Sequence, residues 1–167
     1  MIRIGIISDT HGIDDPAIDR HLSGVDEIWH AGDIGDVDTY RRLEAMAPVL
    51  RAVCGNIDGA MLRRVCPELL VFETEGAKIV MTHIGGYPRR YAPGIRNILM
   101  REKPRIFVSG HSHILRVMPD PDLDLLHINP GAAGNQGWQK IRTLVRLTLD
   151  AGIPKELEVV HLSQPLI

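Results

Sequence analysis

The chain has 167 residues, of which 44% are hydrophobic, and its formal net charge is −2. This length suits a single domain with one core, expected over residues 1–167, and the apolar content excludes a disordered chain. Without a basic excess, long nucleic acid is not expected as a partner, whereas a small phosphorylated ligand is compatible with a metal site.

The N-terminal residues contain no recognisable targeting segment. Met1–Ile7 leads straight into a motif without a cleavable apolar region, and no apolar run reaches the length of a membrane span. Cys54 and Cys66 lack the spacing of a zinc knuckle and are expected to be buried small hydrophobes in a reducing compartment. A cytoplasmic protein without membrane contact is the expectation.

The first half of the chain alternates predicted strands with predicted helices. One helix is expected to begin at Asp15-Pro16, because proline suits an early helical position, and another to cover Asp36–Ala47 and end at Pro48. The predicted strands, each an apolar run, are Ile2–Ser8, Val25–His30 and Val49–Val53. This alternation is typical of an α/β fold with parallel strands.

The second half is richer in predicted hairpins. Turns are expected at Glu75-Gly76, across Pro119–Asp122 and at Ala151-Gly152, and one helix is expected over Tyr91–Lys103. The predicted strands are Leu69–Glu73, Lys78–Thr82, Arg105–Ser109, Ile114–Met118, Leu123–Ile128, Thr143–Leu149 and Glu156–Leu162. Together the two halves predict one α/β domain with mixed, partly antiparallel sheets.

Side chains of metal-ligand type follow five of the predicted strands. They are Asp9, His11, Asp33, Asn56, His83, His111 and His113. Because sites in α/β folds form at the carboxyl ends of strands, these side chains are expected to converge. Imidazole and carboxylate suit zinc, iron, manganese, nickel or cobalt, and the two oxygens of Asp33 allow it to bridge two ions.

Seven ligands with one shared are enough for two four-ligand sites. Two ions about 3.5–4 Å apart can clamp the attacking and leaving oxygens of an in-line displacement. A water between them has its pKa lowered toward neutrality, and the resulting metal-bound hydroxide needs no serine or cysteine nucleophile beside it. The sequence therefore predicts hydrolysis of phosphate esters.

The order of these motifs resembles the calcineurin-like metallophosphoesterase superfamily. The motifs that carry the resemblance are Asp9-x-His11, Gly32-Asp33, Gly55-Asn56, His83 and Gly110-His111-x-His113. The chain length, Ser8–Gly12 and Asn129-Pro130-Gly131 resemble its small YfcE-like bacterial and archaeal phosphodiesterases. The resemblance implies a four-layer αββα sandwich, with two mixed β-sheets flanked by helices, and a dinuclear site.

The resemblance also implies a role for each ligand. One divalent transition-metal ion is expected on Asp9, His11 and His113, and a second on Asn56, His83 and His111, with Asp33 as the bridge. Mn²⁺ is the first expectation, and Ni²⁺, Fe²⁺, Zn²⁺ and Co²⁺ are alternatives. The predicted catalytic residues are His11, Asp33 and Asn56, with the ring of His11 on the leaving side.

Two positions depart from the superfamily pattern. Many members have a histidine after the asparagine, where it assists the leaving group, whereas here Ile57 follows Asn56. This favours phosphodiesters or activated esters over ordinary monoesters, and Asp58 matches the YfcE-like group. Glycine usually follows the ligand histidine, but here Ile84 does, so that loop is expected to have a different shape.

Asp58, Arg89 and Arg90 are the candidates for substrate contact. The arginine pair follows the glycine-rich turn after His83, where it can form charge-assisted hydrogen bonds to phosphate, although a solvated loop is the commoner meaning of such a pair. His30 is either a partner that orients a ligand or a histidine of the core.

Two other functions are kept as alternatives. One is a phosphomonoesterase or nucleotide hydrolase of the same superfamily, and the other is a catalytically weak scaffold, for which the retromer subunit that resembles this family is a precedent. A scaffold is expected to have lost ligands, whereas all seven are present here. A homodimer is expected only from the prevalence of twofold symmetry.

Overall fold

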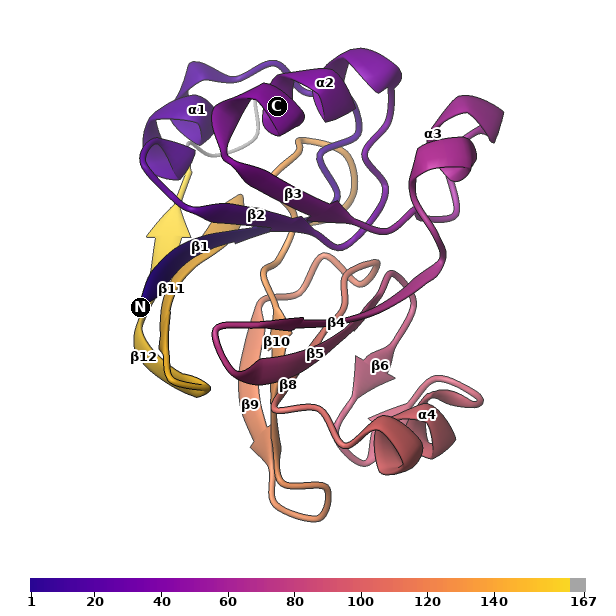
Figure 1. Ribbon diagram of the computed structural model, residues 1–167. Helices are drawn as coiled ribbons and strands as arrows, with labels where there is room; N and C mark the ends of the chain where they lie inside the picture. Colours follow the sequence, from indigo (N-terminus) through magenta and orange to yellow (C-terminus); the bar gives the residue numbers. More distant parts are fainter. Residues whose placement is uncertain (163–167) are drawn as a thin grey trace.

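The structure is a computed structural model and describes residues 1–162. Within this range, two five-stranded sheets pack face to face and helices cover their outer sides (Figure 1). The helices are α1 (Pro16–Leu22), α2 (Val37–Met46), α3 (Ala60–Val65) and α4 (Ile95–Glu102). The predicted domain also includes residues 163–167, which lie outside the described residues.

The first sheet has the order β12-β11-β1-β2-β3. Its strands are β1 (Ile2–Ile7), β2 (Glu27–His30), β3 (Val49–Ala52), β11 (Thr143–Asp150) and β12 (Ile153–His161). The first three strands run parallel, and β11 and β12 complete the sheet in antiparallel pairing. The parallel part therefore brings three strand ends to one edge, as expected of buried apolar runs joined by helices.

The second sheet has the order β4-β5-β8-β10-β9. Its strands are β4 (Leu69–Thr74), β5 (Ala77–Thr82), β8 (Ile106–Val108), β9 (Arg116–Asp120) and β10 (Leu125–Asn129). Pairing is parallel between β5, β8 and β10 and antiparallel at both edges, so this sheet is mixed as well. A short hairpin of β6 (Gly86–Tyr87) and β7 (Arg90–Tyr91) follows β5.

Apolar side chains fill three interfaces between four layers. Between the two sheets lie buried residues from both, among them Ile6, Trp29 and Ile79. Leu22 of α1 and Leu43 of α2 pack on the outer side of the first sheet, while α4 covers the second sheet with residues such as Leu99. The predicted αββα sandwich with two mixed sheets is therefore confirmed.

Side-chain caps define where the first two helices begin. The Asp15 carboxylate accepts a hydrogen bond from the Ala17 N–H, with Pro16 in the first helical turn, as the sequence predicted. The Asp36 carboxylate accepts from the Thr39 N–H in the same way, so α2 lies within one residue of its predicted bounds.

Helix α4 and the segment before it differ from the sequence prediction. The helix was expected to begin at Tyr91, but it begins at Ile95. Tyr91 instead pairs with Gly86 in the β6–β7 hairpin, and Gly94 at the N-cap has a left-handed backbone with φ of 83°. The strand pairing of Tyr91 therefore prevails over the helical periodicity of the sequence, and the helix begins later. The short helix α3 and the β6–β7 hairpin were not predicted.

The turn between β9 and β10 lies two residues later than expected. Pro119 was assigned to the turn, but it pairs with Leu126 as part of β9. An edge strand tolerates proline because one side of the strand needs no ladder hydrogen bond. The Asp120 carboxylate then accepts from the N–H groups of Asp122 and Leu123, which closes the turn.

Two expectations about the chain as a whole can be compared with the structure. Among the described residues, no helix combines the length and apolar character needed to cross a membrane. Cys54 and Cys66 are free and buried, as expected of small hydrophobes.

Candidate metal centre

The five loops that carry the predicted ligands meet at one edge of the sandwich. Three loops follow β1, β2 and β3 of the first sheet, and two follow β5 and β8 of the second. Backbone hydrogen bonds tie neighbouring loops together, from Asp9 N–H to the Gly32 carbonyl and from Gly110 N–H to the His83 carbonyl. All seven predicted side chains come together there in two adjoining clusters.

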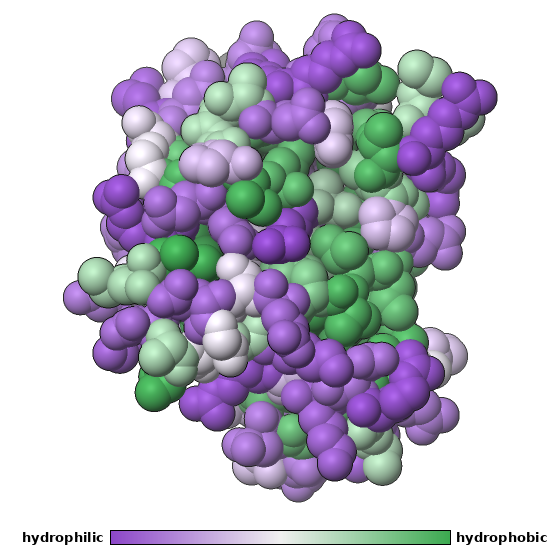
Figure 2. Space-filling view, viewed as in Figure 1, coloured by the Kyte–Doolittle hydropathy of each residue, from purple (hydrophilic) through white to green (hydrophobic). Residues whose placement is uncertain are grey.

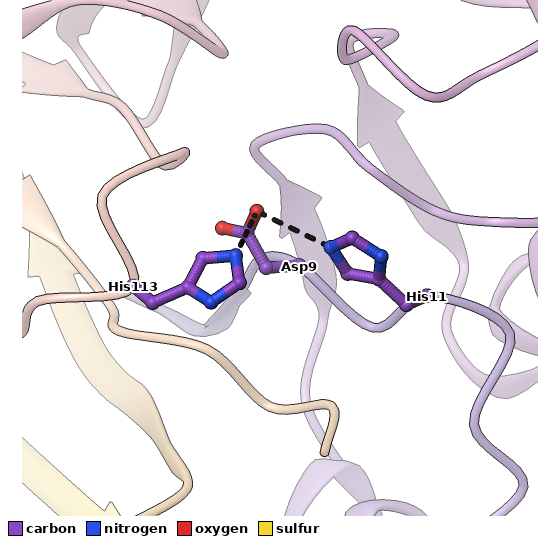
Figure 3. Close-up of side chains that lie close together, drawn as sticks. All are labelled: Asp9, His11 and His113. Atoms are coloured by element: carbon purple, nitrogen blue, oxygen red, sulfur yellow. Dashed lines mark ion pairs between the residues drawn. The ribbon is translucent and has the colours of Figure 1, made fainter. Parts of the chain in front are cut away.

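The first cluster consists of Asp9, His11 and His113 (Figure 3). One potential ligand atom from each lies within 4.8 Å of the others. Both imidazoles point toward Asp9, with His113 Nε2 at 3.1 Å and His11 Nε2 at 3.9 Å from Asp9 Oδ1. Asp9 Oδ1 and His11 Nε2 are buried and have no hydrogen-bond partner among the described residues.

Contacts on the far side of this cluster determine which atoms face inward. Asp9 Oδ2 accepts hydrogen bonds from the Ser8 hydroxyl and the His111 N–H, so Oδ1 is left to face the imidazoles. His113 Nδ1 lies 2.9 Å from Gln139 Oε1, an acceptor, and therefore carries the proton. Nε2 is thereby turned toward a carboxylate oxygen, and in the neutral ring its lone pair is available to a cation between them.

The second cluster consists of Asp33, His83 and His111, with Asn56 beside them. Asn56 Oδ1 lies 3.0 Å from His83 Nε2 and 3.1 Å from His111 Nδ1. His83 Nδ1 donates to the Ala31 carbonyl at 2.7 Å, so its Nε2 faces the oxygen atoms and is available to a cation when the ring is neutral. The donor set and its orientation fit a divalent transition-metal ion in this cluster also.

Asp33 connects the two clusters through a single oxygen atom. Its Oδ1 accepts from the Ile57 N–H at 3.1 Å. Its Oδ2 lies 3.5 Å from His11 Nε2 in the first cluster and 3.3 Å from His83 Nε2 in the second. This position between two sets of ligands is what a bridging carboxylate requires.

The backbone at the centre is strained in a way that favours a functional role. Five of the seven residues have positive φ values, namely Asp9 (54°), His11 (48°), Asp33 (55°), His111 (71°) and His113 (61°). Left-handed backbone is uncommon for residues other than glycine and gathers at sites where the surrounding structure enforces it. The tight turns aim side chains from different strands at one point.

Two glycines explain part of the Gly-Asn and Gly-His motifs. A Cβ at Gly55 would meet the carboxylate and the backbone nitrogen of Asp33. A Cβ at Gly110 would meet the Ser8 hydroxyl and Asp9 Oδ2. At both positions the backbone approaches a ligand so closely that any side chain would displace it.

The charges of the two clusters depend on one another. Burial opposes ionisation of Asp9, but the facing imidazoles of His11 and His113 outweigh it and hold the pKa of Asp9 well below its ordinary value. The Asp9 carboxylate raises the pKa of His113. Burial opposes protonation of His83, yet Asp33 and Asp9 raise its pKa. The site thus keeps its carboxylates negative and attracts positive charge.

His30 supports the ligand loops from beneath. It is fully buried, and burial lowers its pKa to about 4, so it is neutral. Its Nδ1 accepts from the Gly32 N–H, and its Nε2 therefore donates to the Thr10 hydroxyl, which in turn donates to the Ile34 carbonyl. Of the two interpretations of His30, the structure supports a histidine of the core, which holds the loops that carry the ligands but has no hydrogen bond to a ligand side chain among the described residues.

Asp58 has a different position from the one expected of a substrate contact. It is 3% exposed, and its carboxylate accepts hydrogen bonds from the N–H groups of Ile34, Gly35 and Gly55. These bonds join the Asp33 loop to the Asn56 loop. The structure thus assigns Asp58 to holding two ligand loops together, in place of the predicted contact with substrate.

Arg89 and Arg90 are exposed on the β6–β7 hairpin. Among the described residues, neither has a hydrogen bond or ion pair to the seven side chains of the centre. Their contact with a substrate stays a prediction.

Several residues that shape the centre were missed by the sequence analysis. Ser8 stands directly before Asp9 at a strand end, and its hydroxyl could have been considered as a partner of that carboxylate. Gln139 lies 26 residues after His113 in a loop, and no local pattern marks it. Arg63 donates to the carbonyls of Gly55 and Asp58 and so holds the Asn56 loop from the side of α3.

Comparison with known proteins identifies the family. Residues 2–152 match the calcineurin-like phosphoesterase superfamily domain. A probable metallophosphoesterase from Methanothermobacter thermautotrophicus is 33% identical over 134 residues, which are 77% of this chain and 76% of the relative. One from Methanocaldococcus jannaschii is 33% identical over 135 residues, which are 77% of this chain and 67% of that relative.

Solved structures with low identity share the fold. A novel archaeal phosphodiesterase matches with a TM-score of 0.73 and 21% identity over 96% of this chain and 100% of its own. Wild-type Vps29 from Entamoeba histolytica, complexed with Zn²⁺, matches with a TM-score of 0.73 and 20% identity over 96% of this chain and 99% of its own. The match over residues 2–152 and the archaeal relatives confirm the resemblance seen in the motifs: the chain belongs to the calcineurin-like phosphoesterase superfamily.

Proposed function

We propose that this chain is a metal-dependent phosphodiesterase with a dinuclear centre. The observation that carries the proposal is the position of Asp33 Oδ2, which faces His11 of one cluster and His83 of the other. The proposed ions are two divalent transition metals, with Mn²⁺ first and Ni²⁺, Fe²⁺, Zn²⁺ or Co²⁺ as alternatives, because the donors are imidazole nitrogens and carboxylate or amide oxygens.

The residues of this chain are proposed to bind the two ions and to set the charge of the site. When bound, the two ions supply a water of lowered pKa and positive charge for the reacting phosphate. Asp9 and Asp33 supply the negative charge that attracts them, and Asn56 adds a neutral oxygen that limits this charge. His11 presents Nε2 to both carboxylates, so we assign it to the first ion rather than to the leaving group.

The residue after Asn56 supports diesters as substrates. Ile57 is 46% exposed beside the second cluster and offers no proton to a departing alkoxide. A monoester with a poor leaving group depends on such help more than an activated ester does. We therefore place small phosphodiesters ahead of monoesters, and the alternative of a monoesterase or nucleotide hydrolase second.

A scaffold without turnover is the other alternative, and the geometry argues against it. A protein that had lost catalysis would be free to lose the inward orientation of its histidines. Here Gln139 and the Ala31 carbonyl orient His113 and His83, so both ligand nitrogens face carboxylates. This supports an enzyme whose centre is retained for its chemistry.

Hydrolysis of two matched chromogenic substrates tests the proposal. Bis(p-nitrophenyl) phosphate and p-nitrophenyl phosphate release the same leaving group, so their rates compare diester with monoester directly. The purified protein is assayed with Mn²⁺, Ni²⁺, Co²⁺, Zn²⁺, Fe²⁺ or no metal. We expect metal-dependent turnover with the diester preferred. Rates at background with every metal would overturn the proposal. A preference for the monoester would contradict the choice of diesters as substrates.

A further inference from the structure

A pocket of about 300 Å³ adjoins the second cluster. Its lining includes Asn56 and His83 of that cluster, together with Cys54, Gly55, Arg63, Glu68, Thr82 and Ile84. In the space-filling view apolar side chains gather between α3 and the second sheet, on the side of the molecule where β3 leads into α3 (Figure 2). A group that fills this pocket touches the reaction centre itself.

Apolar and polar side chains both line the pocket. Ile84 directly follows His83 and is 48% exposed, and Cys54 Sγ accepts a contact from Arg63 Nη1 at 3.5 Å. The polar lining comes from Thr82, Glu68 and Arg63. A ligand that matches this mixed lining needs carbon surface for Ile84 and groups that donate hydrogen bonds.

The polar lining is arranged by contacts within the chain. Arg63 donates to Glu68 Oε1 at 2.8 Å and also to the carbonyls of Gly55 and Asp58. Thr82 Oγ1 donates to the Glu68 carbonyl at 2.9 Å. Glu68 Oε2 keeps acceptor positions that hydroxyl groups can use, because a carboxylate has about four lone-pair sites.

The charges in the pocket give a second anionic group no net attraction. The Arg63 guanidinium is compensated by the Glu68 carboxylate at 2.8 Å, and the Glu68 side chain is 80% exposed. A second phosphate or a carboxylate therefore finds no free positive charge here, whereas the negative phosphate of the substrate belongs at the metal clusters. A neutral ligand with hydroxyl groups needs no such charge.

We propose that this pocket binds one ester group of the substrate, and that it selects a neutral, hydroxylated group of the size of a single sugar. This inference rests on the proposed function, because it places the phosphate at the dinuclear centre. Glu68 and Thr82 contact the hydroxyl groups, and Ile84 packs on the carbon face. Glu68 and Ile84 are thus specificity residues of the pocket.

Binding of two phosphate monoesters to the Mn²⁺-loaded protein tests this pocket. Ribose 5-phosphate carries the sugar, and methyl phosphate carries the same phosphate without it. Isothermal titration calorimetry gives both dissociation constants, and inhibition of bis(p-nitrophenyl) phosphate hydrolysis gives them independently. We expect ribose 5-phosphate to bind at least about tenfold more tightly, as one hydrogen-bonded contact to a charged group provides.

Three variants assign the effect to the pocket. In Glu68→Ala the preference for ribose 5-phosphate is expected to fall to less than about twofold, with methyl phosphate unaffected. Ile84→Trp fills the pocket and is expected to remove the preference as well. Glu73→Ala, which removes an exposed carboxylate of β4 outside the pocket, is the matched control and keeps it. Metal content is measured for each variant.

The outcomes separate the pocket from the function. Diester turnover together with equal binding of both monoesters in the wild type, or a tenfold preference that survives Glu68→Ala, overturns the pocket inference alone. Absence of diester turnover together with absence of monoester binding overturns the proposed function and the pocket with it.

Discussion

The two clusters of the centre have similar ligands but different surroundings. In the first cluster the protein contacts the far side of its ligands, with Ser8 and the His111 N–H on Asp9 and Gln139 on His113. In the second cluster Asp33 and His83 are buried and similarly held, whereas Asn56 and His111 are exposed and contact each other. One cluster is enclosed, and the other opens on the pocket.

This difference suggests how the work is divided between the clusters. An enclosed set of oriented ligands binds an ion tightly and keeps it, because little reorganisation is needed. A half-exposed set leaves room for a substrate beside its ion. We therefore expect the ion of the second cluster to exchange with solution faster than the ion of the first, and the substrate to approach from the side of the second.

The largest effect is expected where the clusters join. Asp33→Asn keeps the shape of the side chain but removes the negative charge that both ions share in the proposed centre. We expect kcat/KM for the diester to fall by roughly 10²–10³-fold or more, together with loss of at least one bound metal per chain. Steady-state kinetics and metal analysis of the dialysed protein measure both effects.

Asp38→Asn is the matched control for this change, because Asp38 is an exposed aspartate in the first turn of α2. It is expected to leave both quantities unchanged. Full activity in Asp33→Asn would contradict the bridging role.

The next effect concerns the close approach between two ligand loops. In Gly55→Ala the added methyl group meets the Asp33 carboxylate, so the bridge must move. We expect a loss of about tenfold or more in kcat/KM, and overpacking that destabilises the fold by about 1–3 kcal/mol. Gly59→Ala in the same segment is the control, since nothing lies within 4 Å of its added Cβ. Equal behaviour of the two variants, measured by kinetics and denaturation, would refute this account.

A smaller change separates the first cluster from the second. Gln139→Ala removes the acceptor that orients His113 while leaving every ligand in place. The affinity for the first ion is expected to fall about 10–100-fold, the usual cost of losing such an orienting partner, with the second ion unaffected. Competition with a fluorescent chelator measures both affinities, and the exposed Gln136→Ala serves as control. A loss shared equally by both ions would mean that the clusters are not separately supported.

The last prediction concerns stability rather than activity. His127 is buried against Phe107, and burial lowers its pKa to about 4 from the ordinary 6.5. Between pH 6.5 and 4, His127 therefore binds a proton in the unfolded chain but not in the folded chain. The resulting stability is present above pH 6.5 and is lost as the pH falls through this window, by at most about 3 kcal/mol for this group.

Urea denaturation of the metal-free protein across this range measures the effect. His127→Gln is expected to make the dependence shallower, whereas the exposed His161→Gln leaves it unchanged. An equally steep slope in His127→Gln would exclude His127 as its source. Since His30 has a similarly lowered pKa, part of the slope is expected to persist.

The convergence of the seven side chains of ligand type could be predicted from the sequence because each one follows an apolar run. Asp9 comes after Ile2–Ile7 and His83 directly after Ala77–Thr82, so strand ends and ligand types coincide along the chain. The αββα layers were predictable through the family resemblance, and the alternation of strands and helices agrees with them.

Contacts between distant residues were the part that the sequence did not reveal. Gln139 reaches His113 from a loop without a motif, and Asp58 binds backbone groups of a loop 23 and 24 residues away. The start of α4 was wrong because strand pairing of Tyr91 overrides helical periodicity. The turn after β9 was wrong because proline is tolerated at the sheet edge.

Anomalous X-ray scattering from crystals of the protein grown with Mn²⁺ tests the shared dinuclear centre most directly. We predict two manganese peaks about 3.5–4 Å apart, one against Asp9, His11 and His113 and the other against Asn56, His83 and His111, with Asp33 in contact with both. A single peak, or two peaks that do not share Asp33, would contradict the bridged centre on which the proposed phosphodiesterase activity depends.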